Sequence, residues 1–103
     1  MEVRTAASPR DVKHYTTDRL REEFLIQDLF QADKINLVYS HIDRIITGAA
    51  VPFNEKLVLT AGDELRAEYF LQRRELGIIN IGGDGIITID GRVYEVNARD
   101  GMY

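Results

Sequence analysis

A histidine and an aspartate stand two residues apart in the first half of the chain and could carry acid–base chemistry. His41 and Asp43 fall in a run rich in β-branched and aromatic residues, which is typical of a strand. Positions i and i+2 of a strand face the same side, so the carboxylate could orient the imidazole for proton transfer. The alternative, which we favour, is a polar pair that faces solvent or a subunit interface. Arg44 would project from the opposite face.

A second polar cluster, Arg73-Arg74-Glu75, follows about thirty residues later. Neighbouring side chains on a strand point to opposite faces, so at most one of the two arginines lies inside. A buried guanidinium needs an anion, which Glu75, Glu68 or a ligand carboxylate could supply. We favour an internal ion pair that orders the fold. Because arginine binds carboxylates through two parallel hydrogen bonds, the candidate substrate-binding residues are Arg44, Arg73, Arg74 and Glu75.

The elements that must position these side chains have the pattern of short strands. Apolar, β-branched and aromatic residues gather in four stretches, which are residues 24–30, 34–51, 55–62 and 67–83. Strands of this length at short spacing indicate an all-β sandwich or barrel.

The first part of the chain has a different character. Residues 1–16 are polar, and we predict an arm that is extended or poorly ordered. Thr17 or Asp18 could accept hydrogen bonds from the first free amides of a helix. One short helix is therefore expected over Asp18–Glu23, as the only helix. The predicted organisation is an arm over residues 1–16 and a β-rich domain over residues 17–103.

The most specific local signal is the dipeptide Asp90-Gly91 between two apolar runs. A two-residue Asp-Gly loop favours a type I′ turn, because both central residues need a positive φ. The turn fixes the register of the hairpin, with the pairs Ile89–Arg92, Ile87–Tyr94 and Gly85–Val96. The inward face should then carry Ile87, Ile89, Tyr94 and Val96.

Composition and charge exclude several classes of function. The chain has 103 residues, of which 45% are hydrophobic and 29% charged, as expected for one globular domain. A net charge of -4 argues against nucleic-acid binding. Without cysteine there are no disulfides, thiolate metal sites or cysteine nucleophiles, which fits the cytoplasm. No apolar signal segment or membrane-length run is present, so we expect no membrane partner.

The spacing from Gly62 to Gly82 resembles the first motif of the cupin barrels. In that motif a glycine precedes a His-x-His pair, a glutamate and a second glycine, and here Glu75 and both glycines fit the spacing. Glu68 and Phe70 replace the two histidines. Since a cupin metal is held by imidazoles and a carboxylate, we predict no metal site in this chain. The expected fold is a cupin-like jelly-roll barrel or half-barrel with one short helix.

Longer segments narrow the resemblance to one family. Tyr39–Gly48 and Tyr69–Val96 are similar to the 5-keto-4-deoxyuronate isomerases, also called 4-deoxy-L-threo-5-hexosulose-uronate ketol-isomerases. The similarity begins near Leu20 and covers nearly all of the chain that follows. These enzymes are bicupins of two to three times this length, so the chain resembles their N-terminal portion, truncated before the C-terminal cupin.

The resemblance implies an intramolecular oxidoreductase of pectin and uronate breakdown. Such an enzyme converts 5-keto-4-deoxyuronate to 3-deoxy-D-glycero-2,5-hexodiulosonate by moving a proton between neighbouring carbons through an enediol. It also implies zinc in the C-terminal cupin, with no cofactor in this chain, a uronate-derived substrate and a homo-oligomer. The chain alone would be inactive and structural, with His41 and Asp43 as the candidate catalytic residues.

One rival from another functional class stays open. The chain could be a free-standing, metal-free cupin module that binds an anionic sugar as a sensor or assembly domain. Continuation of the reading frame into a β-rich segment with clustered histidines and glutamates would favour the enzyme. A half-barrel would leave strand edges unpaired, so we also expect self-association.

Overall fold

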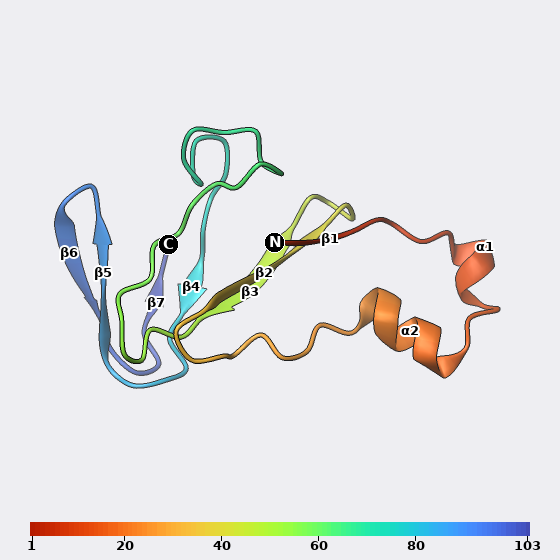
Figure 1. Cartoon of the computed structure of the whole chain (residues 1–103), viewed down its shortest axis with the longest axis horizontal. Coiled ribbons are helices and arrows are strands. Elements are labelled where there is room, and N and C mark those ends of the chain that lie inside the picture. The colour runs from red at the N-terminus through yellow and green to blue at the C-terminus, as the bar shows by residue number, and fades with distance from the viewer.

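The chain folds into short strands, long loops and two short helices. The computed structural model describes all residues, 1–103, and its elements are spread along one long axis (Figure 1). In chain order they are β1 (Glu2–Arg4), α1 (Pro9–Val12), α2 (Thr17–Phe24), β2 (Ile35–Ser40), β3 (Ile46–Ala50), β4 (Ile78–Ile79), β5 (Gly85–Ile89), β6 (Arg92–Val96) and β7 (Gly101–Met102). The strand-rich class predicted from the sequence is confirmed.

The largest sheet has three strands in the order β1-β2-β3. β2 is its centre, and its sequence INLVYS holds the β-branched and aromatic residues that suit a half-buried pleated surface. β3 returns antiparallel to β2, with Tyr39 opposite Ile46, while β1 runs parallel to β2, with Val3 opposite Tyr39. The outer edge of β3 pairs with no other strand.

The Asp90-Gly91 hairpin has the predicted register. β5 and β6 pair as Ile89–Arg92, Ile87–Tyr94 and Gly85–Val96, and both turn residues have positive φ, 49° and 79°. Val96 is buried, and Ile87 and Tyr94 are half-buried on the predicted inward face. Ile89 was also predicted to face inward, but it is 41% exposed next to the Asp90-Gly91 turn.

Asn80 links the two small sheets at the C-terminal end of the chain. Its side-chain amide donates to the carbonyl oxygens of Gly83 and Val96, both at 2.8 Å, and its Oδ1 accepts the Gly82 N–H. Its backbone N–H donates to the Asp100 carbonyl at 2.9 Å. Through its side chain and its backbone, Asn80 therefore joins the entry of the hairpin to the short β4–β7 pair.

The N-terminal part of the chain contains two helices, where the sequence predicted one. α2 lies where a helix was expected, although its N-cap is Thr16, whose Oγ1 accepts the Arg19 N–H. α1 is a second helix, with Ser8 as its N-cap, and β1 is docked on β2. The prediction of a single helix is therefore wrong, and the predicted arm, residues 1–16, contains both β1 and α1. Neither helix is long and apolar enough to cross a membrane.

Two other predicted strands are absent, and a third region is mostly loop. Residues 24–30 and 55–62 form no strand, and within 67–83 only β4 is paired. These stretches are apolar enough for strands, but a strand exists only where another strand accepts its hydrogen bonds. Residues 58–62 instead lie across the face of β2, near Ile35 and Leu37.

The core is small for a chain of this length. The buried side chains are Val38, Tyr39, Ala61, Phe70 and Val96. The accessible surface is 8486 Å², whereas a compact monomer of this size would expose about 5,900 Å². Large apolar side chains contribute to this additional exposed surface, including Phe53, which is 78% exposed, and Ile79, which is 76% exposed. The three separate sheets do not close into a barrel, so the jelly roll remains a prediction.

Candidate functional site

The turn between β2 and β3 carries His41, Asp43 and Arg44. The Ser40 N–H donates to the Ile45 carbonyl at 2.8 Å and closes this turn. Asp43 and Arg44 both have positive φ, 55° and 54°, a conformation that is uncommon for residues other than glycine. The prediction that these residues occupy a regular strand is therefore wrong, and the faces deduced from strand alternation do not apply to His41, Asp43 and Arg44.

The aromatic ring of Tyr39 gathers the polar groups around this turn. The His41 ring packs edge-on against it, with 5.0 Å between the ring centroids. The Arg74 guanidinium carbon lies 5.1 Å from the centroid of the same ring. Tyr39 is buried at the end of the central strand, which gives the cluster a rigid base. We call Tyr39, His41 and Arg74 the tyrosine cluster.

Arg74 joins the tyrosine cluster from a distant loop. Its Nη1 donates to the Arg44 carbonyl oxygen at 2.9 Å, and its Nη2 donates to the Tyr39 hydroxyl at 3.4 Å. Arg74 is half-buried, whereas its neighbour Arg73 is exposed. Both arginines are in a loop, so the predicted alternation along a strand is wrong, although only one of the two points inward.

The predicted internal ion pair is also wrong. The ion pairs of the chain are Arg4–Glu2 at 2.6 Å and Arg19–Glu23 at 3.8 Å, and neither includes Arg74. Glu75 lies beside the Tyr103 hydroxyl instead, where its carboxylate raises the pKa of Tyr103. The structure therefore brings His41, Arg44 and Arg74 together and leaves Arg73 and Glu75 outside the cluster.

The residues at the cupin-motif positions do not fit a metal ion. Phe70 is buried and has no ligating atom, and Glu68 is exposed and donates its backbone N–H to the Gln72 side chain. The two histidines are separated, with His14 beside the helices and His41 in the β2–β3 turn. No three metal-ligating side chains come together.

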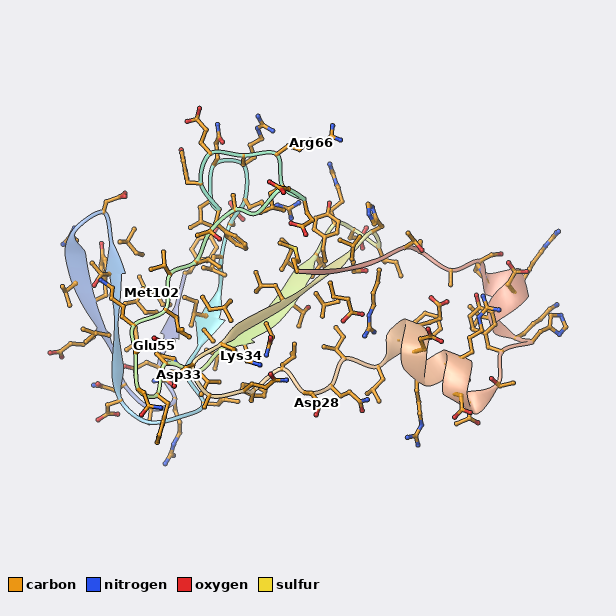
Figure 2. The ribbon with its side chains drawn as sticks, in the orientation of Figure 1. Asp28, Asp33, Lys34, Glu55, Arg66 and Met102 are labelled. Carbon is orange, nitrogen blue, oxygen red and sulfur yellow. The ribbon has the colours of Figure 1, made fainter.

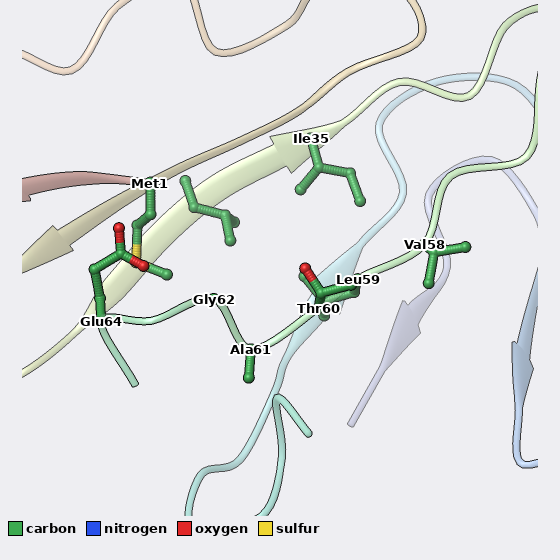
Figure 3. Close-up of a pocket in the computed structure, with 9 residues that line it drawn as sticks. Met1, Ile35, Val58, Leu59, Thr60, Ala61, Gly62 and Glu64 are labelled. Carbon is green, nitrogen blue, oxygen red and sulfur yellow. The ribbon is translucent and has the colours of Figure 1, made fainter. Parts of the chain in front are cut away.

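A groove is lined by residues of β2 and by residues 58–62 (Figure 3). It measures about 240 Å³, and six of its nine lining residues are hydrophobic, with Glu64 as the charged side chain. Its side chains include no lysine, arginine or histidine. The groove is therefore separate in chemistry from the tyrosine cluster.

The strongest carboxylate contacts of the chain lie elsewhere, at Asp33. Its Oδ1 accepts the backbone N–H groups of Phe53, Asn54 and Glu55, at 2.7–3.2 Å, and its Oδ2 accepts the Asn54 amide at 2.8 Å. These hydrogen bonds lower the pKa of Asp33. Figure 2 shows Asp33 next to Glu55, far from Arg66 in the loop beyond the groove. Asp33 therefore ties the entry of β2 to the loop after β3.

Two of these residues could not be found from the sequence as site residues. Tyr39 reads as an ordinary core tyrosine, because its partner Arg74 is thirty-five positions away. Asp33 has no local motif, since it binds amides some twenty residues further along. Predicting a role for Tyr39 or Asp33 would have required knowing which distant loops contact them.

Proteins related to this chain are named as ketol-isomerases. The chain is 80% identical over all 103 residues to the 4-deoxy-L-threo-5-hexosulose-uronate ketol-isomerase of Lachnoclostridium phytofermentans. It is 58% identical over its full length to the enzyme of that name from Lachnospira eligens, and 56% over 102 residues to that from Formosa agariphila. No family profile matches the chain.

The similarity covers the whole chain but only part of each relative. The chain spans 37% of the length of the first two relatives and 36% of the third. The resemblance to the uronate ketol-isomerases is therefore confirmed along the entire sequence.

Proposed function

We propose that this chain is the N-terminal, cupin-like part of a 4-deoxy-L-threo-5-hexosulose-uronate ketol-isomerase. The observation that carries the proposal is the 80% identity to such an enzyme over every residue of the chain. The longer polypeptide, of a length comparable to the relatives, is called the complete protein below. It would act in uronate breakdown in the cytoplasm and assemble as a homo-oligomer.

The proposed reaction moves a hydrogen between two neighbouring carbons of a sugar acid. A base removes the proton from the hydroxyl-bearing carbon, the enediol forms, and a proton returns to the former carbonyl carbon, so no external oxidant is needed. The product would be 3-deoxy-D-glycero-2,5-hexodiulosonate. Zinc would be bound in the C-terminal cupin of the complete protein; within this chain no three metal-ligating side chains come together.

The role proposed for this chain is architectural, with a substrate contact as its contribution to the reaction. Its strands and uncovered apolar surface suit a part that packs against further polypeptide. Among its candidate catalytic residues, His41 is exposed in the β2–β3 turn and open to a ligand, and Asp43 lies in the same turn.

The test is an isomerase assay of the complete protein on 4-deoxy-L-threo-5-hexosulose uronate. We expect conversion to the 2,5-diketo acid, with solvent hydrogen incorporated during turnover at the carbon that receives the proton. A chelator should abolish turnover. Absence of conversion by a folded, metal-replete protein would contradict the proposal.

One observation supports both the enzyme and the rival function, a free-standing module that binds an anionic sugar. The tyrosine cluster presents a guanidinium without an acidic partner. A sugar-acid complex of a protein that shows no isomerase activity would favour this rival.

A further inference from the structure

Arg74 is a half-buried cation without a negative partner. The ion pairs of the chain occupy Arg4 and Arg19, and the groups that accept from Arg74 are a backbone carbonyl and a hydroxyl, both neutral. Withdrawing a charge from water is unfavourable unless an opposite charge compensates it. An arrangement that holds a guanidinium in place and leaves it unbalanced is suited to an external anion.

The tyrosine cluster keeps several hydrogen-bond donors available. A guanidinium has five N–H donors, and Arg74 uses two of them on the Arg44 carbonyl and the Tyr39 hydroxyl. Because the Tyr39 oxygen accepts from Arg74, its own O–H proton is directed away and can donate to another acceptor. The remaining guanidinium donors and the phenol hydroxyl therefore lie next to one another, joined by the 3.4 Å contact between Arg74 and Tyr39.

The support of these donors is rigid. Tyr39 is buried in the central strand, and the Arg44 carbonyl belongs to a turn closed by the Ser40–Ile45 hydrogen bond. Holding Arg74 at both ends of its fork lowers the entropy lost when a ligand binds. His41, packed against the same ring, adds an exposed imidazole that can bond a ligand hydroxyl.

We propose that Arg74 and Tyr39 form a binding site for the carboxylate of a sugar acid. One guanidinium balances one negative charge, which matches a carboxylate better than a doubly charged phosphate. The neighbouring imidazole suits the hydroxyl groups of a sugar. The choice of a sugar acid over other carboxylates rests on the proposed function, whereas the anion site itself rests on the geometry.

The experiment measures binding in the complete protein, treated with a chelator so that no turnover occurs. Glucuronate and glucose are titrated separately by calorimetry, since they differ mainly in the carboxylate. We expect glucuronate to bind and glucose to bind far more weakly. Arg74→Gln should weaken glucuronate binding by roughly 10- to 100-fold, the range expected for hydrogen bonds to a charged group. Tyr39→Phe, which keeps the ring, should weaken it several-fold.

Arg92→Gln is the matched control. Arg92 also lies over a tyrosine, at 5.4 Å from the Tyr94 ring centroid, but on the β5–β6 hairpin. It should leave glucuronate binding unchanged. Equal affinity of the Arg74→Gln and unsubstituted proteins would overturn the proposed site.

A second measurement avoids dependence on the folding of the variants. In the unsubstituted protein, the ring proton signals of Tyr39 and His41 should shift as glucuronate is added and stay constant with glucose. Saturation of the protein without any change at these rings would also overturn the site. A protein that isomerises normally but fails these tests keeps its proposed function and loses the site. A protein that binds glucuronate through Arg74 but does not isomerise the uronate keeps the site and loses the proposed function.

Discussion

A single carboxylate, that of Asp33, holds two segments together across some twenty residues of chain. It accepts three consecutive backbone N–H groups and one side-chain amide. Hydrogen bonds to the ionised form favour ionisation, which lowers the pKa of Asp33 below its ordinary value of 3.8. Asp33 itself has a positive φ of 58°, which aspartate tolerates better than most residues.

The lowered pKa predicts how this contact depends on pH. The folded state binds the Asp33 proton more weakly than the unfolded state, so the contact contributes its full stability above pH 3.8. That stability falls as the pH drops below 3.8 and is lost once the pH passes the lower, folded pKa. NMR titration of the Phe53, Asn54 and Glu55 amide signals should show a midpoint below 3.8.

Asp33→Asn is the control for this titration. Asparagine keeps one acceptor oxygen and the tolerance of positive φ but does not ionise in this range. The amide signals of Phe53 to Glu55 should then lose the transition. A midpoint at or above 3.8 in the unsubstituted protein would show that the hydrogen bonds do not form.

At the scale of the elements, local signals were predictable and long-range ones were not. The β5–β6 hairpin was predicted to the residue because its register depends on two adjacent turn residues. The stretches 24–30 and 55–62 have strand-like composition, yet they form no ladder. Whether such a stretch pairs depends on which distant strand lies alongside, and composition carries no information about that.

The candidate site was less predictable than the hairpin. The expectation that at most one of Arg73 and Arg74 turns inward agrees with the structure, but its reason, alternation along a strand, does not, because both residues lie in a loop. The turn at Asp43 and Arg44 was not predictable, because neither residue is the glycine that usually marks positive φ. The role of Tyr39 depends on a loop that returns to β2 from residue 74.

The β2–β3 pairing makes a specific demand at Gly48. A Cβ added there would collide with the Asn36 carbonyl oxygen and with the Leu37 side chain. Gly48→Ala should therefore destabilise the complete protein by about 1–3 kcal/mol, as overpacking usually does. The change is measured as the free energy of unfolding in urea.

Gly77→Ala provides the comparison for Gly48. A Cβ at Gly77 would meet no atom within 4 Å, so the substitution should change the stability by no more than about 0.5 kcal/mol. If Gly48→Ala and Gly77→Ala lose the same free energy of unfolding, the loss in Gly48→Ala does not come from the close approach of β3 to β2.

At the scale of the whole molecule, the isolated chain exposes more surface than a compact monomer, and many large apolar side chains are among the exposed ones. Its extents are 49 × 29 × 21 Å, and the helices stand apart from the β5–β6 hairpin at the other end (Figure 1). The outer edge of β3 is unpaired. Unpaired edges and uncovered apolar faces favour pairing with a second copy.

We therefore predict that the 103-residue chain self-associates. Sedimentation equilibrium at micromolar concentration should show dimers or larger species. Thr47→Lys, which adds a charge to the edge strand β3, should weaken the association. A stable monomer at that concentration would contradict the prediction.

The most direct test of the central proposal compares the 103-residue chain with the complete protein in one isomerase assay that also measures bound zinc. We expect the complete protein to isomerise the uronate and to lose activity with a chelator. The chain alone should show neither turnover nor stoichiometric zinc. Turnover by the chain, or zinc bound in equal amount and lost in Glu75→Ala, would contradict a supporting role for this segment.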